Sequence, residues 1–315
     1  MKYNVFGKTG IRVSELCFGT LVMGPLQANL PIPEGQHLLE YAFDLGITLF
    51  DTAHLYRTYP YFTGIPNHTK QKMVINSKSY AFTYTEMKEH IEKGLEAIGR
   101  DYFDIFMLHE QESVLTLKGH EDAFRAMEDA KKEGKIRSIG VSTHTVTLVR
   151  DLMLHPEFEV VHPIFNKASH GLREGNIDDM KKAVQKLYQA GMGIFLMKPL
   201  GGGRLYLDFL SSLQFVHEYP FKQAVAVGVK NEAEIEINIA IFEDRFEESM
   251  LKKLSLHEKK LFYRRDLCAL CYECLEFCHF DVISKGEDTV VFDLAKCVSC
   301  GYCIAHCPHM AIRVL

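Results

Sequence analysis

The segment Cys268–Phe280, CALCYECLEFCHF, decides how the C-terminal part of this chain folds. Its four cysteines follow one another at spacings of three, three and four residues, and the pattern returns at Cys297–Pro308, CVSCGYCIAHCP. Eight of the nine cysteines of the chain therefore lie in its last 50 residues. Clustered cysteines in a reducing compartment are metal ligands or catalytic groups more often than disulfides. We therefore expect a small metal-binding unit at the end of the chain.

The spacing C-x2-C-x2-C-x3-C, present twice, is the bacterial ferredoxin pattern for two [4Fe–4S] clusters. Three cysteines on one tight loop can hold one face of a cluster, and the fourth cysteine of each run reaches the other cluster. Zinc is the alternative, but it uses two cysteine pairs per ion and leaves the third and fourth cysteines unexplained. We therefore assign one cluster to Cys268, Cys271, Cys274 and Cys307, and the other to Cys297, Cys300, Cys303 and Cys278.

Composition narrows the class of protein. The 315 residues include 24% charged and 47% apolar residues, close to an average globular protein, and the net charge is −5. The charge argues against a nucleic-acid partner. We see no apolar run that could span a bilayer and no signal-peptide core, so we expect no membrane partner and a cytoplasmic location.

Short β-rich runs alternate with amphipathic helical patterns such as 85–99 and 120–134, which predicts repeated βα units. Eight units over about 240 residues predict a closed (β/α)8 TIM barrel, with its active site at the carboxyl ends of the strands. A doubly wound dinucleotide-binding sheet is the weaker alternative, because no G-x-G-x-x-G follows the first strand. The expected strands are 15–20, 48–53, 73–78, 104–109, 137–143, 160–166, 193–200 and 223–229.

The predicted domains are a barrel over 1–245, a helical linker over 246–265 and a small α+β ferredoxin-like domain over 266–315. The long charged stretch 243–265 reads as helix. One βα unit is irregular: residues 54–72 carry two prolines and several aromatic residues without a helical period. We expect this segment to be a loop over the barrel mouth, where its aromatic residues could contact a flat or apolar group of a substrate.

Four side chains stand at the ends of the second, third and fourth predicted strands: Asp51, Tyr56, Lys78 and His109. Taken singly, each has an ordinary explanation as a cap, an interface residue or a satisfied core residue. A TIM barrel, however, gathers the carboxyl ends of its strands at one mouth. We therefore expect the four side chains to converge there as a catalytic site.

Together with the segments GKTGIRVSELCFGT, FDTAHLY, SIGVSTH and MKPLGGG, these residues resemble the aldo-keto reductase superfamily, in its branch with a C-terminal ferredoxin domain. The resemblance implies that Tyr56 is the general acid that protonates a carbonyl oxygen. Lys78, paired with Asp51, would lower the pKa of Tyr56, because a free tyrosine titrates near 10. His109 would orient and polarise the carbonyl group.

The resemblance also places a nicotinamide site in the barrel, where the sequence departs from the family. The nicotinamide amide would meet Ser142 and Thr143 in place of a Ser-Asn pair, and His162 in place of a glutamine, with Asn166 nearby. Glu234 falls where NADPH-specific members bind the 2′-phosphate, so NADPH selectivity is not supported. Alternatively, Glu234 and Asn231 form a helix capping box.

The glycines at 201–203 could let backbone amides approach a phosphate, as barrels often do after strands seven and eight, although a plain turn is an alternative. The candidate phosphate contacts in this region are Lys198, Gly201, Gly202, Lys230 and Arg204.

Nicotinamide gives two electrons as hydride, whereas an iron–sulfur cluster passes them singly. We therefore expect either a flavin, which supports both steps, or direct transfer from cluster to substrate. The predicted function is reduction, or reversible oxidation, of a small carbonyl or unsaturated substrate, with electrons from the clusters, from NAD(P)H or from both. The alternatives are an electron-transfer subunit whose barrel docks a ferredoxin-like redox partner, and clusters that only staple a small tail.

Overall fold

The protein is described by a computed structural model of residues 1–315 that excludes residues 254–260, 279–280, 298–301, 306, 310 and 315. All eight predicted strands form one closed parallel barrel in which the last strand, β10, pairs with the first, β3. The predicted TIM barrel is therefore confirmed. Its strands are β3 (Leu16–Gly19), β4 (Leu49–Asp51), β5 (Val74–Ser79), β6 (Phe103–Gln111), β7 (Ile136–Thr143), β8 (Val160–Pro163), β9 (Gly193–Leu196) and β10 (Ala224–Gly228).

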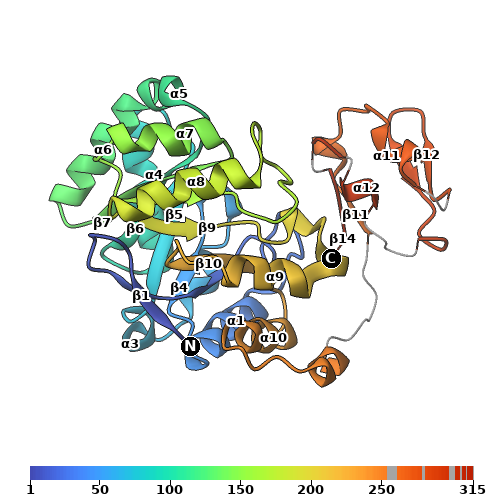
Figure 1. Cartoon of the computed structure of the whole chain (residues 1–315), viewed down its shortest axis with the longest axis horizontal. Helices are drawn as coiled ribbons and strands as arrows, with labels where there is room; N and C mark the ends of the chain where they lie inside the picture. The colour runs from blue at the N-terminus through green and yellow to red at the C-terminus, as the bar shows by residue number, and fades with distance from the viewer. Residues whose placement is uncertain (254–260, 279–280, 298–301, 306, 310, 315) are drawn as a thin grey trace.

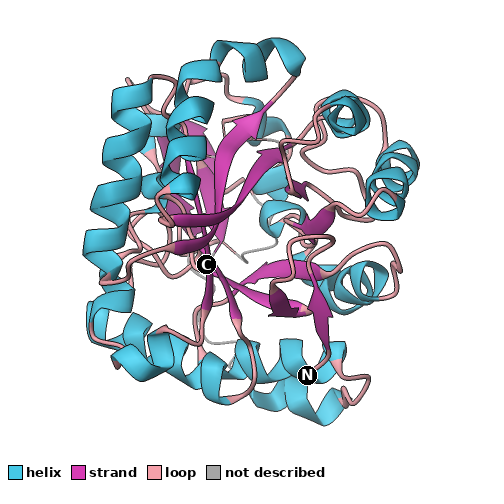
Figure 2. Ribbon diagram, turned by 90° about the vertical axis from the view of Figure 1, so that its left-hand side faces the viewer, coloured by secondary structure: helices cyan, strands magenta, loops and turns pink. Residues whose placement is uncertain are grey.

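Helices surround this barrel, as Figure 2 shows. The helix expected at 85–99 is α4 (Tyr84–Ile98), which begins where Thr83 accepts a hydrogen bond from the Glu86 amide and ends at left-handed Gly99. The other helices over the barrel are α1 (Ile32–Asp44), α5 (Val114–Gly119), α6 (Glu121–Lys132), α7 (Val146–Asp151), α8 (Ile177–Gln189), α9 (Phe209–His217) and α10 (Glu232–Phe242).

The irregular segment 54–72 differs from the prediction. It forms a 3-10 helix at His54–Tyr56 and two single-turn helices, α2 (Pro60–Thr63) and α3 (Asn67–Lys70). Helix α2 contacts both α1 and α4. Tyr59, Tyr61 and Phe62 are buried in the main hydrophobic core. The expectation that this segment is a loop over the mouth with aromatic residues free for a ligand is therefore wrong, because those side chains fill the space of a barrel helix.

A hairpin of β1 (Tyr3–Val5) and β2 (Arg12–Ser14), not predicted from the sequence, precedes the barrel. Phe6, between its strands, is fully buried, and its ring centroid lies 6.0 Å from that of Phe195 in β9. Cys17 in β3 belongs to the same small core and is fully buried, as expected for a free structural thiol. The hairpin therefore helps to fill the barrel interior.

Glu15, directly before the first barrel strand β3, forms a buried ion pair with a residue just before the last barrel strand, β10. Its side chain is 1% exposed and lies 2.7 Å from the Lys222 Nζ and 3.3 Å from the His217 Nδ1. Burial alone raises the pKa of Glu15, but the hydrogen bonds from His217 and Lys222 lower that pKa to about 2. The carboxylate therefore stabilises the fold above its ordinary pKa of 4.5, and this contribution is lost as pH falls toward 2.

We expect Glu15→Gln to lower the free energy of unfolding at pH 7 by about 3 kcal/mol, because the buried Lys222 ammonium then keeps its two backbone carbonyl partners but loses its only carboxylate in the described residues. Urea unfolding of the variant and the wild type at pH 7 and pH 3 measures this, and the difference between them should be smaller at pH 3. Glu89→Gln, which removes an exposed pair with Lys93, is the control and should change stability little. Equal stability of wild type and Glu15→Gln at pH 7 contradicts the assignment.

In its described residues, the cysteine-rich tail contains two short antiparallel strand pairs, a 3-10 helix at Arg265–Leu267 and two single-turn α-helices. Strand β11 (Leu261–Tyr263) pairs with β14 (Ile312–Val314), and β12 (Ile283–Lys285) pairs with β13 (Val290–Phe292). Helices α11 (Glu273–Glu276) and α12 (Tyr302–Ala305) carry the third cysteine of each run. The expected ferredoxin-like α+β arrangement is therefore present, with its own small core of aliphatic side chains and cysteines.

The predicted helical linker is only partly found. Glu248–Lys253 form a 3-10 helix, residues 254–260 lie outside the described part of the chain, and 261–263 are strand β11 rather than helix. The helix expected to 265 is therefore wrong at its C-terminal end, because Leu261–Tyr263 pair with β14 across the tail. The domain limits themselves stay a prediction.

Figure 1 shows the tail beside the barrel, with β11 and β14 nearer to it and β12 farther away. Side chains of the two parts lie close enough to affect one another's pKa: Arg313 in β14 lowers the pKa of Lys198, which follows β9, and Cys307 raises the pKa of Arg204. The tail therefore lies against the loops at the carboxyl end of the barrel strands. None of the helices in the described residues is long and apolar enough to cross a membrane.

Candidate active site and cluster site

Asp51, at the end of β4, anchors the predicted catalytic group. Its Oδ1 accepts hydrogen bonds from the Lys78 Nζ in the neighbouring strand β5 and, at 2.6 Å, from the Asn76 Nδ2. The Lys78 Nζ also donates to the Thr52 carbonyl at 2.9 Å. Lys78 is 1% exposed and Asp51 5% exposed. Parallel pairing of β4 with β5 brings these side chains together, so the buried charges compensate one another.

Tyr56 lies on the 3-10 helix that follows β4, and its ring faces both Lys78 and His109. The Lys78 Nζ is 5.2 Å from the centroid of the Tyr56 ring, and the His109 ring, from β6, meets it edge-on at 5.6 Å. The structure thus brings together all four side chains that the sequence analysis placed at the mouth.

The expected acidification of Tyr56 is not found. Burial raises the pKa of the Tyr56 hydroxyl well above its usual value, and the charge of Asp51 raises it further. The Lys78 ammonium is bonded to the Asp51 carboxylate, so its charge is compensated before it can stabilise a phenolate. The prediction that Lys78 lowers the pKa of Tyr56 is therefore wrong for this arrangement, and Tyr56 is a protonated phenol at neutral pH.

His109 is a neutral imidazole held by packing. Burial lowers the pKa of His109 well below its usual value, and the positive charge of Lys78 lowers it further. Its ring stacks on Tyr80, with centroids 4.1 Å apart. Within the described residues its Nδ1 is buried without a hydrogen-bond partner. A neutral histidine beside a protonated tyrosine provides two groups that can contact one carbonyl oxygen.

The residues predicted to hold a nicotinamide amide are engaged inside the protein. The Ser142 hydroxyl accepts from the Glu110 amide at 2.8 Å, and the Thr143 hydroxyl accepts from the Thr145 amide at 3.0 Å. Asn166 uses both ends of its amide on the backbone of His170, at 2.9 Å each.

His162, the fourth candidate, stacks on Phe195 at 4.0 Å and bonds that residue's carbonyl through Nδ1 at 2.5 Å. Its Nε2 lies 4.0 Å from Asp51, and burial lowers its pKa to about 3. The Ser142, Thr143 and Asn166 side chains and the His162 Nδ1 already have internal partners and so do not fit a nicotinamide amide clamp. The His162 Nε2, in contrast, lies beyond hydrogen-bond distance of Asp51.

The candidate phosphate contacts are spread over two loops. Gly201 and Gly202 adopt left-handed backbone angles, with φ of 57° and 71°, in a short 3-10 turn after β9. The Lys230 amide donates to Glu234 at 2.9 Å at the start of α10, where Asn231 also caps the Glu234 amide. Asn231 is therefore the N-cap as expected, but the reciprocal half of the capping box is not formed, because the Glu234 carboxylate accepts from the Lys230 amide instead of the Asn231 amide.

A second polar group at the mouth contains Lys198, which was a candidate phosphate contact, and three residues that were not predicted from the sequence. The Tyr80 hydroxyl donates to Glu110 at 2.5 Å, Glu110 lies 2.8 Å from the His144 Nδ1, and the His144 Nε2 lies 2.9 Å from the Lys198 Nζ. Tyr80, His144 and Lys198 follow β5, β7 and β9, and Glu110 lies near the end of β6. These residues could have been predicted from the sequence by their position at the ends of strands.

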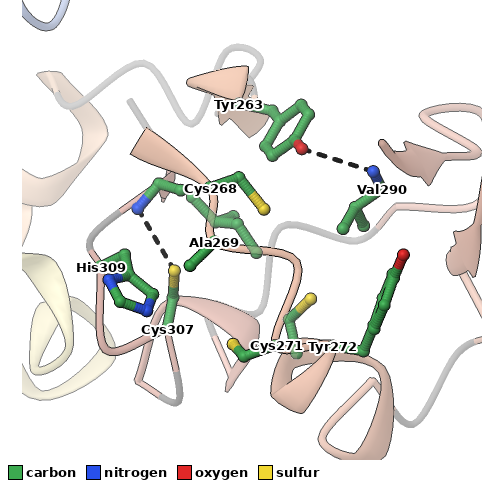
Figure 3. Close-up of a pocket in the computed structure, with 11 residues that line it drawn as sticks. Tyr263, Cys268, Ala269, Cys271, Tyr272, Val290, Cys307 and His309 are labelled. Carbon is green, nitrogen blue, oxygen red and sulfur yellow. Dashed lines mark hydrogen bonds between the residues drawn. The ribbon is translucent and has the colours of Figure 1, made fainter. Parts of the chain in front are cut away.

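Four thiols line one cavity in the tail. They are the side chains of Cys268, Cys271, Cys274 and Cys307, which we assigned to one cluster. Figure 3 shows the sulfurs of Cys268, Cys271 and Cys307 turned toward this space. Burial and the neighbouring thiols raise the pKa of Cys274 to about 11, so bound cationic iron is needed to hold all four as thiolates. The donor set fits a [4Fe–4S] cluster.

The second cluster set can be followed only in part, because Cys300 lies outside the described residues. Cys278, Cys297 and Cys303 belong to the same small core as the first set. The fourth cysteine of each run makes the same local contact: the Val282 amide donates to Cys278 at 3.4 Å and the Ala311 amide to Cys307 at 3.2 Å. The two runs thus share one local design. His279 follows the last cysteine of the first run, where the second run has a proline, and it lies outside the described residues.

Comparison with known proteins decides the family of the barrel. Residues 15–208, more than half of the chain, match the aldo/keto reductase family. The chain belongs to the aldo/keto reductase family. Residues 290–313, which include the whole second cysteine run, match the 4Fe-4S binding domain. This aldo/keto reductase is therefore an oxidoreductase with a 4Fe-4S binding domain.

Individual relatives are distant. The chain is 22% identical to L-galactose dehydrogenase of Arabidopsis thaliana over 65% of its own length and 67% of that protein. It is 23% identical to the aldo-keto reductase YhdN of Bacillus subtilis over 55% and 56% of the two chains.

Among solved structures, the aldo-keto reductase PA4992 of Pseudomonas aeruginosa superposes with a TM-score of 0.67, at 24% identity, over 78% of this chain and 96% of its own. The aldo-keto reductase AKR11C1 of Bacillus halodurans gives 0.65 at 17% identity, over 80% and 96%. These similarities support the barrel fold alone.

Proposed function

We propose that this aldo/keto reductase reduces, or reversibly oxidises, a small carbonyl or unsaturated substrate at the barrel mouth, with electrons that pass through two [4Fe–4S] clusters, a nicotinamide cofactor or both. The observation that carries the proposal is the convergence of Tyr56, Lys78, Asp51 and His109 at one mouth. A scaffold without chemistry has no need to bury an ion pair beside a tyrosine and a neutral histidine at that place.

The residues would act on a carbonyl group as follows. His109 donates a hydrogen bond to the carbonyl oxygen and holds it beside Tyr56. The carbon accepts a hydride equivalent, which is two electrons and one proton, while the Tyr56 hydroxyl gives its proton to the oxygen. The product is an alcohol, and the Tyr56 phenolate regains a proton from water. The ion pair of Lys78 and Asp51 lies beside the Tyr56 ring and would hold that ring in position.

The tail would supply electrons one at a time through its clusters. Because the predicted nicotinamide clamp is occupied by internal hydrogen bonds, a flavin or direct transfer from the clusters is proposed as the link to the two-electron reaction. The proposed ligands are Cys268, Cys271, Cys274 and Cys307 for the first cluster, and Cys278, Cys297, Cys300 and Cys303 for the second.

Anaerobic purification followed by donor titration tests this proposal. Iron, sulfide and flavin are counted first, and the protein is then mixed with NADH, NADPH or a reduced ferredoxin and a panel of small aldehydes and ketones. We expect at least one donor to bleach the cluster absorbance and to drive reduction of a carbonyl compound. Clusters that accept electrons from the ferredoxin while no member of the panel is reduced would favour the electron-transfer scaffold.

A further inference from the structure

Lys198 occupies a strained position at the barrel mouth. It follows β9 with a left-handed backbone, at φ 55°, and Glu110 at the end of β6 has a similar φ of 50°. Residues other than glycine rarely adopt this conformation, and such strain clusters at functional sites. The two strained residues are joined through a single side chain, His144.

His144 orients the Lys198 ammonium. It is 8% exposed, its Nδ1 lies 2.8 Å from a Glu110 carboxylate oxygen, and its Nε2 lies 2.9 Å from the Lys198 Nζ. Burial lowers the pKa of His144, so the ring is neutral and Nε2 can accept a hydrogen bond from the ammonium. Glu110 is itself held by Tyr80 and Arg173. These contacts orient the Lys198 Nζ in the same way that hydrogen-bond partners behind a metal ligand orient that ligand.

The Lys198 charge faces the reaction site and has no carboxylate bonded to it. Within the described residues its hydrogen-bond partner is the neutral His144, and no carboxylate forms an ion pair with it. Its charge lowers the pKa of both His109 and His162. Burial lowers the pKa of Lys198 to about 8. The charged groups that act on it from the surrounding elements are Glu110, Arg313, Arg173 and Lys78. Of the cations among them, Lys78 is paired with Asp51, and Arg173 with Glu110 and Glu112.

We propose that Lys198, oriented by His144 and Glu110, binds a carboxylate group of the substrate beside the reacting carbonyl. This inference rests on the proposed reduction in the barrel and specifies its substrate class as a small oxo acid. One ammonium with a neutral neighbour matches a carboxylate with a single charge, whereas phosphate sites combine several backbone amides or an arginine fork. Because the described residues place a neutral histidine and no carboxylate on the Lys198 ammonium, that ammonium can pair with an anion of the substrate.

Calorimetric binding to the cluster-loaded full chain under anaerobic conditions tests the subsite. The probes are oxamate, a small carboxylate with an adjacent carbonyl, and oxamide, its uncharged counterpart. We expect Lys198→Gln to weaken oxamate binding on the order of tenfold or more and to leave oxamide binding unchanged. Lys186→Gln, which removes an exposed charge on α8, is the matched control and should change neither.

The pH dependence separates recognition from a structural role of Lys198. In the wild type, oxamate binding should weaken between pH 7 and pH 9.5, because Lys198 loses its proton around 8. Lys198→Arg should keep oxamate binding and lose this pH dependence, since an arginine stays charged. Unchanged oxamate affinity in Lys198→Gln overturns the proposal. The proposal is also overturned if Lys198→Gln binds ADP-ribose more weakly than the wild type but binds oxamate normally. That result would assign Lys198 to a nucleotide phosphate. Binding is measured without turnover, so the result is independent of the role of Tyr56.

Discussion

Replacing Tyr56 with phenylalanine is expected to lower kcat/KM for carbonyl reduction by roughly 100- to 10,000-fold, the usual contribution of a positioned general acid. The variant keeps the ring that packs against His109 but loses the only proton of Tyr56 that can reach the carbonyl oxygen. Reduction of the clusters by dithionite should be unchanged, because the tail cysteines do not involve Tyr56. The measurements are steady-state turnover and the loss of cluster absorbance on reduction.

Tyr61→Phe is the matched control, since it removes a hydroxyl in the same segment whose bond goes to the Leu30 carbonyl at 2.8 Å. It should lower stability modestly and leave kcat/KM nearly unchanged. If Tyr56→Phe turns over at the wild-type rate while its clusters still cycle, the barrel does not use Tyr56 as an acid. The scaffold alternative then gains support.

The raised pKa of Tyr56 adds a pH test of the same role. An acid works only while it is protonated, and burial keeps Tyr56 protonated well above its ordinary pKa of 10. With an uncharged aldehyde, kcat/KM should therefore not fall between pH 7 and pH 9.5 through loss of the Tyr56 proton. A decline with a midpoint below pH 8 would instead indicate that Lys78 acidifies the hydroxyl, as first expected from the family.

The parts of the fold that could be predicted are those governed by local patterns. Strand spacing and the alternation of strands with amphipathic helices were enough to find all eight barrel strands, and strand ends were enough to place Asp51, Lys78 and His109 together. The segment 54–72 was misjudged because its prolines and aromatic residues resemble a loop. Its buried side chains pack between α1 and α4. This is tertiary packing, which the local spacing of apolar residues in the sequence does not reveal.

Electrostatics at the site could not be predicted residue by residue. The presence of Lys78 near Tyr56 suggested a lowered pKa, but the outcome depends on whether the ammonium is bonded to Asp51 and on how deeply the phenol is buried. In the same way, Ser142 and Asn166 stand where a cofactor was expected, yet their polar atoms are used by the Glu110 and His170 backbone. Only the three-dimensional structure shows which charges are compensated and which polar atoms already have hydrogen-bond partners.

In the proposed arrangement, the fourth cysteine of each run binds the cluster of the other run. Pairs of substitutions distinguish this arrangement from one in which each run binds its own cluster with all four of its cysteines. Each single cysteine-to-serine change should cost one cluster, which lowers the iron content from about eight to about four per chain. If Cys307 serves the first cluster, the double variant Cys271→Ser with Cys307→Ser damages one cluster twice and should still hold about four irons.

The matched pair, Cys271→Ser with Cys303→Ser, damages both clusters and should retain almost no iron. Were the runs separate instead, Cys271→Ser with Cys307→Ser would be the nearly iron-free variant, since Cys307 would then serve the cluster of Cys303. The four thiols that line one cavity favour the exchanged assignment, because Cys307 reaches that cavity from the second run while Cys268, Cys271 and Cys274 come from the first. Iron and sulfide analysis after anaerobic reconstitution decides between the two arrangements.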